Sequence, residues 1–214
     1  IYNGCAERYF QPRDAKTQKR IRQSLNIPES AIVIFTAARL VRSKGHQHQL
    51  TAMERLQQTP QWGSLYFLWA GSGSEEAALK AKAEALGVAD YVRFLGDRSD
   101  IGDLLDASDI FVLPSHFEGM PLSIIEAMAK GCAVAATNIS GIPEALGNAG
   151  QLLSDPTIEP VQTARELAEI IEQWTTNSEL RTAVAEACRQ RSHQLFQPET
   201  MINAYSKLIA IILI

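Results

Sequence analysis

Residues 32–38, IVIFTAA, form a nearly continuous apolar run that leads directly into the polar loop RLVRSKG at residues 39–45. A run of this kind, without alternation, is typical of a strand that is buried on both faces of a parallel sheet. Residues 46–58 then favour a helix. Strand, loop and helix in this order predict one unit of a doubly wound sheet, in which the loops at the carboxyl ends of the strands hold ligands.

The rest of the chain continues the alternation of strands and helices. Further strands are predicted near residues 65–70, 91–95, 109–113, 133–136 and 150–153, with helices near 75–87, 100–107, 122–130 and 142–147. Three helical stretches without strands between them follow at residues 159–175, 178–193 and 198–212. The pattern predicts a Rossmann-like α/β fold, with a parallel sheet covered by helices on both faces. We expect a single domain over residues 1–214, onto which the helices of residues 159–212 pack.

The cations Arg39 and Lys44 lie in the loop after the first strand. Arg39 offers a planar guanidinium that can bind two oxygens at once, and Lys44 offers a compact charge. Because this loop leaves the carboxyl end of a parallel strand, the pair indicates an anion site that suits a diphosphate. The alternative is a basic loop that is simply solvated.

A second motif occupies residues 117–131, FEGMPLSIIEAMAKG. Pro121 suits the first turn of a helix, so we expect a helix to begin near Pro121 or Leu122. Its first amides have no partner within the helix and can hold a phosphate, with Glu118 beside them. Glu126 lies among apolar neighbours and needs hydrogen-bond donors, which sugar hydroxyls would supply. The alternative is that both glutamates face solvent.

Several blocks together resemble the donor-binding domain of the retaining glycosyltransferase family 4 (group 1), which has the two-domain architecture called GT-B. The order and spacing of the blocks cover most of the chain, and Ser140 departs from the pattern where the family usually has the first glycine of a pair. The matching blocks are Arg39-Leu40 with Lys44-Gly45, then 70–73, 92–96, 109–115, 118–126, 131–137 and 141–144.

The resemblance implies a role for each matching residue. Arg39 and Lys44 would neutralise the diphosphate of the donor and Glu118 would bind hydroxyls of the transferred sugar, so these three form the expected catalytic set. Donor binding would also involve the ribose contact Glu126, the amides that form a phosphate cradle, and backbone groups near the base. These further residues are Gly71, Phe94, Leu95, Gly119, Met120, Pro121, Leu122 and Glu126. The resemblance implies no metal and no cofactor besides the nucleoside-diphosphate sugar itself.

The resemblance also implies a larger protein. The acceptor-binding amino-terminal domain of the family is absent from the sequence, so we expect the isolated domain to bind the donor without transferring sugar. The expected reaction moves a hexose-type sugar to a glycan, lipid or small acceptor, as in polysaccharide or lipopolysaccharide biosynthesis. A cytoplasmic location is expected, with the inner face of the membrane as a peripheral site where a membrane-surface acceptor would be reached.

Other functions remain open at this stage. A non-catalytic module that binds a nucleotide sugar for regulation would keep the same donor site, and GT-B epimerases and phosphorylases share the architecture. A nicotinamide-binding domain would use Gly71 and Gly73, but Glu76 stands where a third glycine belongs. A glycoside hydrolase could use Glu118 and Glu126 as its carboxylate pair, but this would leave the basic loop unexplained.

Composition limits the remaining classes. A formal net charge of −4 argues against broad nucleic-acid binding, so no nucleic-acid partner is expected. Cys5, Cys132 and Cys188 lack the spacing of a metal site and are expected to be buried thiols. The apolar end of the chain, residues 209–214, is expected to pack into the core of this domain, with the absent domain or a membrane as alternatives.

Overall fold

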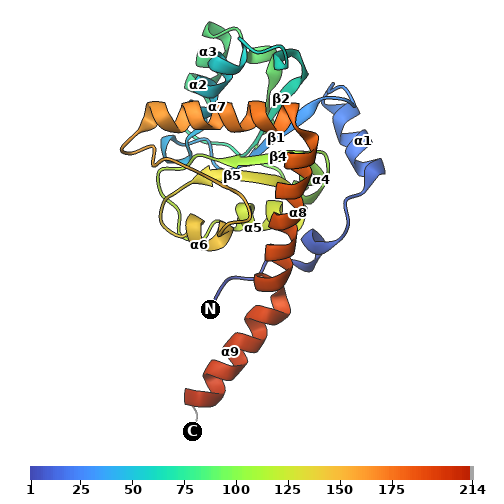
Figure 1. The fold of residues 1–214 in the computed structure, drawn as a ribbon, viewed down its shortest axis with the longest axis vertical. Helices are drawn as coiled ribbons and strands as arrows, with labels where there is room; N and C mark the ends of the chain where they lie inside the picture. Colours follow the sequence, from blue (N-terminus) through green and yellow to red (C-terminus); the bar gives the residue numbers. More distant parts are fainter. Residues whose placement is uncertain (213–214) are drawn as a thin grey trace.

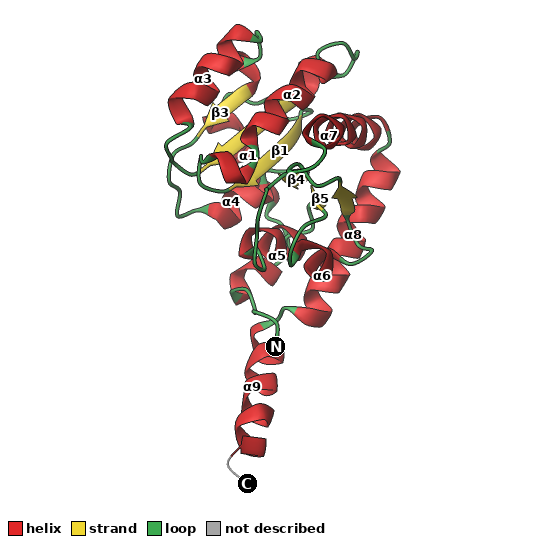
Figure 2. Cartoon of the chain, turned by 90° about the vertical axis from the view of Figure 1, so that its left-hand side faces the viewer, coloured by secondary structure: helices red, strands yellow, loops and turns green. Residues whose placement is uncertain are grey.

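The structure is a computed structural model that describes residues 1–212. These residues contain a six-stranded parallel sheet with the strand order β3-β2-β1-β4-β5-β6, as Figures 1 and 2 show. The predicted Rossmann-like fold class is therefore confirmed. The strands are β1 (Ile32–Ala37), β2 (Leu65–Ala70), β3 (Val92–Phe94), β4 (Ile110–Leu113), β5 (Ala133–Thr137) and β6 (Gln151–Leu153).

Helices cover both faces of the sheet, and each face has its own hydrophobic cluster. One cluster joins the sheet to α1, α4, α5, α6 and α8, and the other joins it to α2, α3 and α7. The helices are α1 (Ala15–Ser24), α2 (His46–Leu56), α3 (Glu76–Ala85), α4 (Ile101–Asp106), α5 (Leu122–Ala129), α6 (Ile142–Leu146), α7 (Pro160–Thr176), α8 (Ser178–Leu195) and α9 (Pro198–Ile212). The predicted helices match these bounds to within a few residues.

The strand order changes direction between β1 and β4. Successive strands move outward from β1 to β3, and the chain then returns to place β4 on the other side of β1. The loop after β1 leads into α2 on one face, and the loop after β4 leads into α5 on the other face. Figure 2 shows this edge of the sheet, with α2 and α5 on either side of the strand ends. Ligands bind at such a switch point in open α/β sheets because the two loops diverge there.

The carboxyl-terminal helix corrects one expectation. We expected residues 209–214 to pack into the core, but α9 projects away from the sheet in Figure 1. Ile209 and Ile211 are exposed, the latter to 72%, and residues 213–214 lie outside the described part of the chain. The hydrophobic clusters are already complete without this helix, because Phe196 is the last residue that either cluster contains.

Candidate functional site

The loop after β1 is held against its neighbours by close backbone contacts. Gly45 has a φ of 77°, and a Cβ atom at this position would lie 1.8 Å from the carbonyl oxygen of Pro114, in the loop after β4. Gly71 has a φ of 135°, and a Cβ atom there would lie 2.2 Å from the carbonyl oxygen of Ala38. Glycine is therefore required at both positions, and the loops after β1, β2 and β4 converge at one edge of the sheet.

Lys44 and Glu118 meet at this edge. The Lys44 Nζ donates a hydrogen bond to Glu118 Oε1 at 2.6 Å, and the Ser115 hydroxyl donates to the same oxygen at 2.8 Å. The side chains of Lys44 and Glu118 are only 20% and 10% exposed. Within residues 1–212, no further hydrogen bond is formed by this carboxylate, so Oε2 is left for a ligand. The basic loop and the glutamate motif thus meet at this edge of the sheet.

Arg39 differs from Lys44 in its surroundings. Its side chain is exposed, and it makes no hydrogen bond or ion pair with any described residue. Of these two cations, Lys44 is therefore held in place by Glu118 and Arg39 is unengaged. An unengaged guanidinium can bind two oxygens of an anion without first breaking an ion pair.

The turn before α5 leaves amides available. The helix begins at Leu122 with Pro121 as its N-cap residue, as predicted, and no side chain caps the helix. Its first hydrogen bond to the cap runs from the amide of Ile124 to the carbonyl oxygen of Pro121 at 3.1 Å. The amides of Leu122 and Ser123 precede this bond, so they can face an anion.

Gly119 and Met120 lie in the same turn, which contacts the loop after β5. A Cβ atom on Gly141 would lie 1.9 Å from the carbonyl oxygen of Gly119 and 3.5 Å from the Cα atom of Met120. The neighbouring Ser140 has a φ of 48°, in the left-handed region that favours glycine. A glycine would adopt this backbone conformation without the strain that a side chain adds.

Glu126 lies one turn further along α5 and is half-buried. It is close to Arg8 and Tyr9 in the amino-terminal segment, and burial raises the pKa of its carboxyl, an effect that the Tyr9 hydroxyl and the Arg8 guanidinium partly offset. Within the described residues, no hydrogen bond or ion pair joins Glu126 to the Lys44–Glu118 pair. The two glutamates of the motif therefore have different surroundings.

The residues expected near a base are largely engaged in the sheet. The amide of Leu95 donates to the carbonyl oxygen of Trp69 at 2.9 Å, and the Phe94 ring packs edge-on against Trp69 with centroids 5.1 Å apart. The amide of Gly71 donates to the carbonyl oxygen of Gly96 at 2.7 Å. Among the expected backbone groups, the amides of Gly71 and Leu95 are thus already used.

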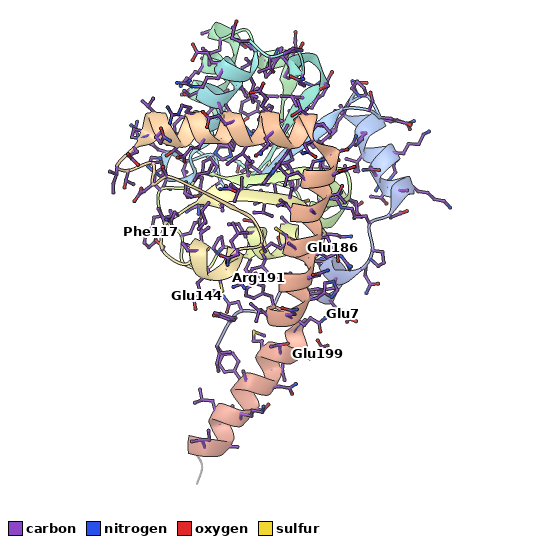
Figure 3. All side chains as sticks on the ribbon, viewed as in Figure 1. Glu7, Phe117, Glu144, Glu186, Arg191 and Glu199 are labelled. Carbon is purple, nitrogen blue, oxygen red and sulfur yellow. The ribbon has the colours of Figure 1, made fainter. Side chains whose placement is uncertain are left out.

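Two contacts at this edge, made by Ser115 and by the His116 amide, were not predicted from the sequence. Ser115 orients Glu118, and His116 contacts the loop after β1 through its amide, which donates to the Ser43 carbonyl oxygen at 2.8 Å. Phe117, labelled in Figure 3, lies on the outer surface of the same loop and is 71% exposed. Only the spacing to Glu118 linked these residues to the site, and spacing alone does not reveal contacts across loops.

The described residues show no metal-binding arrangement. No group of three or more His, Cys, Asp or Glu side chains among residues 1–212 could hold a metal ion. Cys5, Cys132 and Cys188 are buried free thiols, as expected. The same part of the chain contains no helix with the length and hydropathy that a membrane span requires.

A comparison with models of known protein families shows to which family the chain belongs. The family model described as "Glycosyl transferases group 1" matches residues 17–191. The chain belongs to this family. It is 31% identical over 189 residues to the "Lipopolysaccharide core biosynthesis glycosyltransferase LpsE" of Rhizobium meliloti, and this match covers 88% of the chain and 53% of the relative. The chain thus spans about half the length of such curated relatives.

Solved structures of other proteins share the fold. A glycosyltransferase from Rickettsia africae superimposes with a TM-score of 0.88 and 24% identity, covering 100% of this chain and 56% of that one. The Anabaena protein HepE in complex with UDP-glucose has a TM-score of 0.84 and 25% identity, covering 98% of this chain and 56% of that one. Both neighbours are longer proteins, which agrees with the half-length match to the curated relatives.

Proposed function

We propose that this group 1 chain is the donor-binding half of a retaining GT-B glycosyltransferase of family 4, and that residues 1–214 bind a nucleoside-diphosphate sugar. The observation that carries the proposal is the Lys44–Glu118 pair at 2.6 Å, formed where the loops after β1 and β4 meet at the switch point. Arg39 and the first amides of α5 lie in the same two loops. These groups together suit a ligand that carries both phosphates and hydroxyls.

The chemistry of the reaction fits the charges at this edge. Cleaving a sugar–diphosphate bond develops positive charge on the sugar and negative charge on the leaving phosphate. Lys44, Arg39 and the amides of Gly119, Met120 and Leu122 would stabilise the phosphate, and preorganised donors of this kind lower the barrier directly. Because Lys44 Nζ is held at Glu118, the phosphate-binding cation and the sugar-binding carboxylate occupy adjacent positions.

Glu126 has a separate role in this proposal. Its half-buried carboxylate would accept hydrogen bonds from the ribose hydroxyls, which would compensate for the burial that raises its pKa. Phe94 and Leu95 would contribute carbonyl groups and packing near the base. The scheme includes no metal ion, because Lys44, Arg39 and the amides would supply the positive charge at the phosphates.

The comparisons support a nucleotide-sugar ligand. HepE was solved in complex with UDP-glucose, and LpsE acts in lipopolysaccharide core biosynthesis. We therefore infer a hexose-type donor, a glycan or lipid acceptor, and an acceptor-binding domain outside these residues. A chain of this kind would work in the cytoplasm, with membrane-bound acceptors reached at the inner face of the membrane.

Nucleotide binding tests the proposal directly. We expect UDP or another nucleoside diphosphate to bind in isothermal titration calorimetry, and Lys44→Ala to weaken this binding about tenfold to a hundredfold, because a charge-assisted hydrogen bond is lost. Lys16→Ala removes an exposed lysine of α1 and serves as the matched control. Failure of a folded chain to bind UDP, GDP or ADP, or equal binding by Lys44→Ala, would contradict the proposed site.

The sugar contact and the retaining outcome need separate experiments. We expect Glu118→Gln to keep affinity for the free nucleotide and to lose the additional affinity that the attached sugar confers. Transfer by a full-length protein, with the anomeric configuration of the product read by NMR, tests retention. A full-length protein that binds the donor and transfers no sugar would instead indicate a regulatory module.

A further inference from the structure

Two histidines face each other beside the proposed donor site. His48 lies in the first turn of α2, and His116 lies in the loop after β4, two residues before Glu118. Their Nε2 atoms are 2.8 Å apart, and their ring centroids are 5.1 Å apart. The side-chain amide nitrogen of Gln47 lies 3.1 Å from the Nε2 atom of His116.

The 2.8 Å distance between the two Nε2 atoms determines where the ring protons lie. One Nε2 must carry the proton and donate it, and the other must be unprotonated and accept it. The two rings are therefore opposite tautomers, with one Nε2–H and one Nδ1–H. When both Nε2 atoms carry protons, two N–H groups face each other, at least one ring is positively charged, and the contact is lost.

The pair adds a third link between the same two segments. The His116 amide already donates to the Ser43 carbonyl oxygen at 2.8 Å, and Lys44 contacts Glu118 at 2.6 Å. We propose that His48 and His116 form a histidine clasp, a positioning device that holds the Glu118 loop against the start of α2 and releases it when both facing Nε2 atoms carry protons. The clasp rests on the proposed function only for its effect on nucleotide-sugar binding.

Charged groups on three further segments surround the clasp. Burial, the neighbouring His116, Lys82 of α3 and Arg42 of the loop after β1 together lower the pKa of His48 to about 4. Burial and Arg42 also lower the pKa of His116, and Asp155 after β6 opposes this effect. Both rings are therefore neutral at pH 7, where the clasp is closed. His116 is the less buried ring, so acidification is expected to protonate it first.

Ring tautomers test the clasp without any nucleotide. Long-range 1H–15N correlation NMR at pH 7.5 is expected to show one of the two rings as the Nε2–H tautomer and the other as the Nδ1–H tautomer. His193 lies outside the clasp and supplies a reference signal. Identical tautomers of His48 and His116 at this pH would overturn the proposal, since two identical tautomers cannot share a proton between their Nε2 atoms.

Amide exchange tests the positioning role. In His48→Leu, we expect the His116 amide to exchange with solvent about threefold to tenfold faster at pH 7.5, which corresponds to the net loss of one neutral hydrogen bond. In the wild type, protection of this amide should decrease as the pH is lowered from 7.5 toward about 4, after correction for intrinsic exchange, and His48→Leu should lack this decrease. His193→Leu is the control. Equal protection and equal pH profiles in wild type and His48→Leu would overturn the positioning role.

Nucleotide affinity separates the clasp from the proposed function. We expect UDP to bind His48→Leu about threefold to tenfold more weakly than the wild type at pH 7.5. Opposite tautomers in a chain that binds no nucleotide would support the clasp and contradict the proposed donor site. Normal UDP binding by a chain whose two histidines are identical tautomers would support the proposed donor site and contradict the clasp.

Discussion

At the scale of single residues, Gly45 controls how closely the loops after β1 and β4 approach. Gly45→Ala would place a methyl group against the Pro114 carbonyl oxygen and force a side chain into the left-handed region. We expect a loss of more than about 2 kcal/mol in the free energy of unfolding, because positive φ alone costs roughly 1–2 kcal/mol. Chemical denaturation measures this. Gly63→Ala, where nothing lies within 4 Å of the added Cβ, is the control and should change stability by less than about 0.5 kcal/mol.

The sequence predicted which loops at the strand ends carry the site residues. It did not predict which side chains of different loops contact one another. Lys44 and Glu118 were assigned to one site by the resemblance to the glycosyltransferase family, and both follow buried parallel strands, whose carboxyl ends share an edge. His48 and His116 lie 68 positions apart, and each follows its local pattern without any feature that indicates the other. Side-chain pairs of this kind depend on the distance between two loops, which periodicity does not encode.

At the scale of elements, a buried ion pair joins α4 to the end of α5. The Lys130 Nζ lies 2.8 Å from Asp106 Oδ1, and both side chains are 6% exposed. We expect Lys130→Met to cost roughly 3–5 kcal/mol in the free energy of unfolding, because it leaves a buried carboxylate without a partner. Lys130→Met combined with Asp106→Leu should recover most of the loss. Urea denaturation of the single and double variants measures both effects.

The matched control is an exposed pair of the same chemistry. Lys80 and Glu76 of α3 are 2.7 Å apart, with side chains 50% and 34% exposed. We expect Lys80→Met to cost less than about 1 kcal/mol, because solvent screens the pair. If Lys80→Met and Lys130→Met reduced stability equally, burial would not be the cause of the larger effect.

Two terminal helices were predicted less well than the alternating core. No bounds were predicted for α1, although Asp14 caps it by accepting from the amides of Lys16 and Thr17, because its apolar face is short and its composition strongly basic. For α9 the helix was predicted correctly and its burial was not. An apolar stripe in the sequence predicts that one face of the helix is apolar. It does not predict which part of the protein packs against that face.

The position of α9 leads to a truncation experiment. Removing residues 205–214 should shift the melting temperature by less than about 2 °C, because the side chains of residues 205–211 are exposed. Phe196→Ala is the contrasting change. Phe196 is fully buried and packs against Tyr2 with ring centroids 5.6 Å apart, so its loss should cost roughly 3–5 kcal/mol. A truncation as destabilising as Phe196→Ala would show that α9 packs on the domain.

At the scale of the whole molecule, the sheet separates two cores, and sequence periodicity identified both of them. β1, β2, β4 and β5 were recognisable because their side chains are buried on both faces, which requires near-continuous apolar runs. Polar groups inside these cores were less visible. Gln49 accepts a hydrogen bond from the Trp69 indole at 2.8 Å and donates to the Thr36 hydroxyl at 2.9 Å. This network lies entirely within the core between β1, β2 and α2.

The same core makes global stability depend on pH. His46 is fully buried against Trp69, neither of its ring nitrogens has a hydrogen-bond partner in the described structure, and burial lowers its pKa to about 4. The unfolded chain takes up a proton on this residue near pH 6.5, and the folded chain resists doing so until about pH 4. The free energy of unfolding is therefore highest above about pH 6.5. Between about pH 6.5 and pH 4 it falls by about 1.4 kcal/mol per pH unit for each such histidine.

Denaturation at pH 7.5, 6.5, 5.5 and 4.5 measures this dependence. We expect His46→Leu to flatten the decline between pH 6.5 and 4.5 by about 1.4 kcal/mol per pH unit relative to the wild type, and His48→Leu to act in the same direction. Glu126 opposes them, because its raised pKa lets the folded chain gain stability as its carboxyl is protonated. Carboxylates with lowered pKa, such as Asp100, lose their contribution only as the pH approaches their usual range near 4. An unchanged slope in His46→Leu would mean that the buried imidazole is protonated in the folded chain.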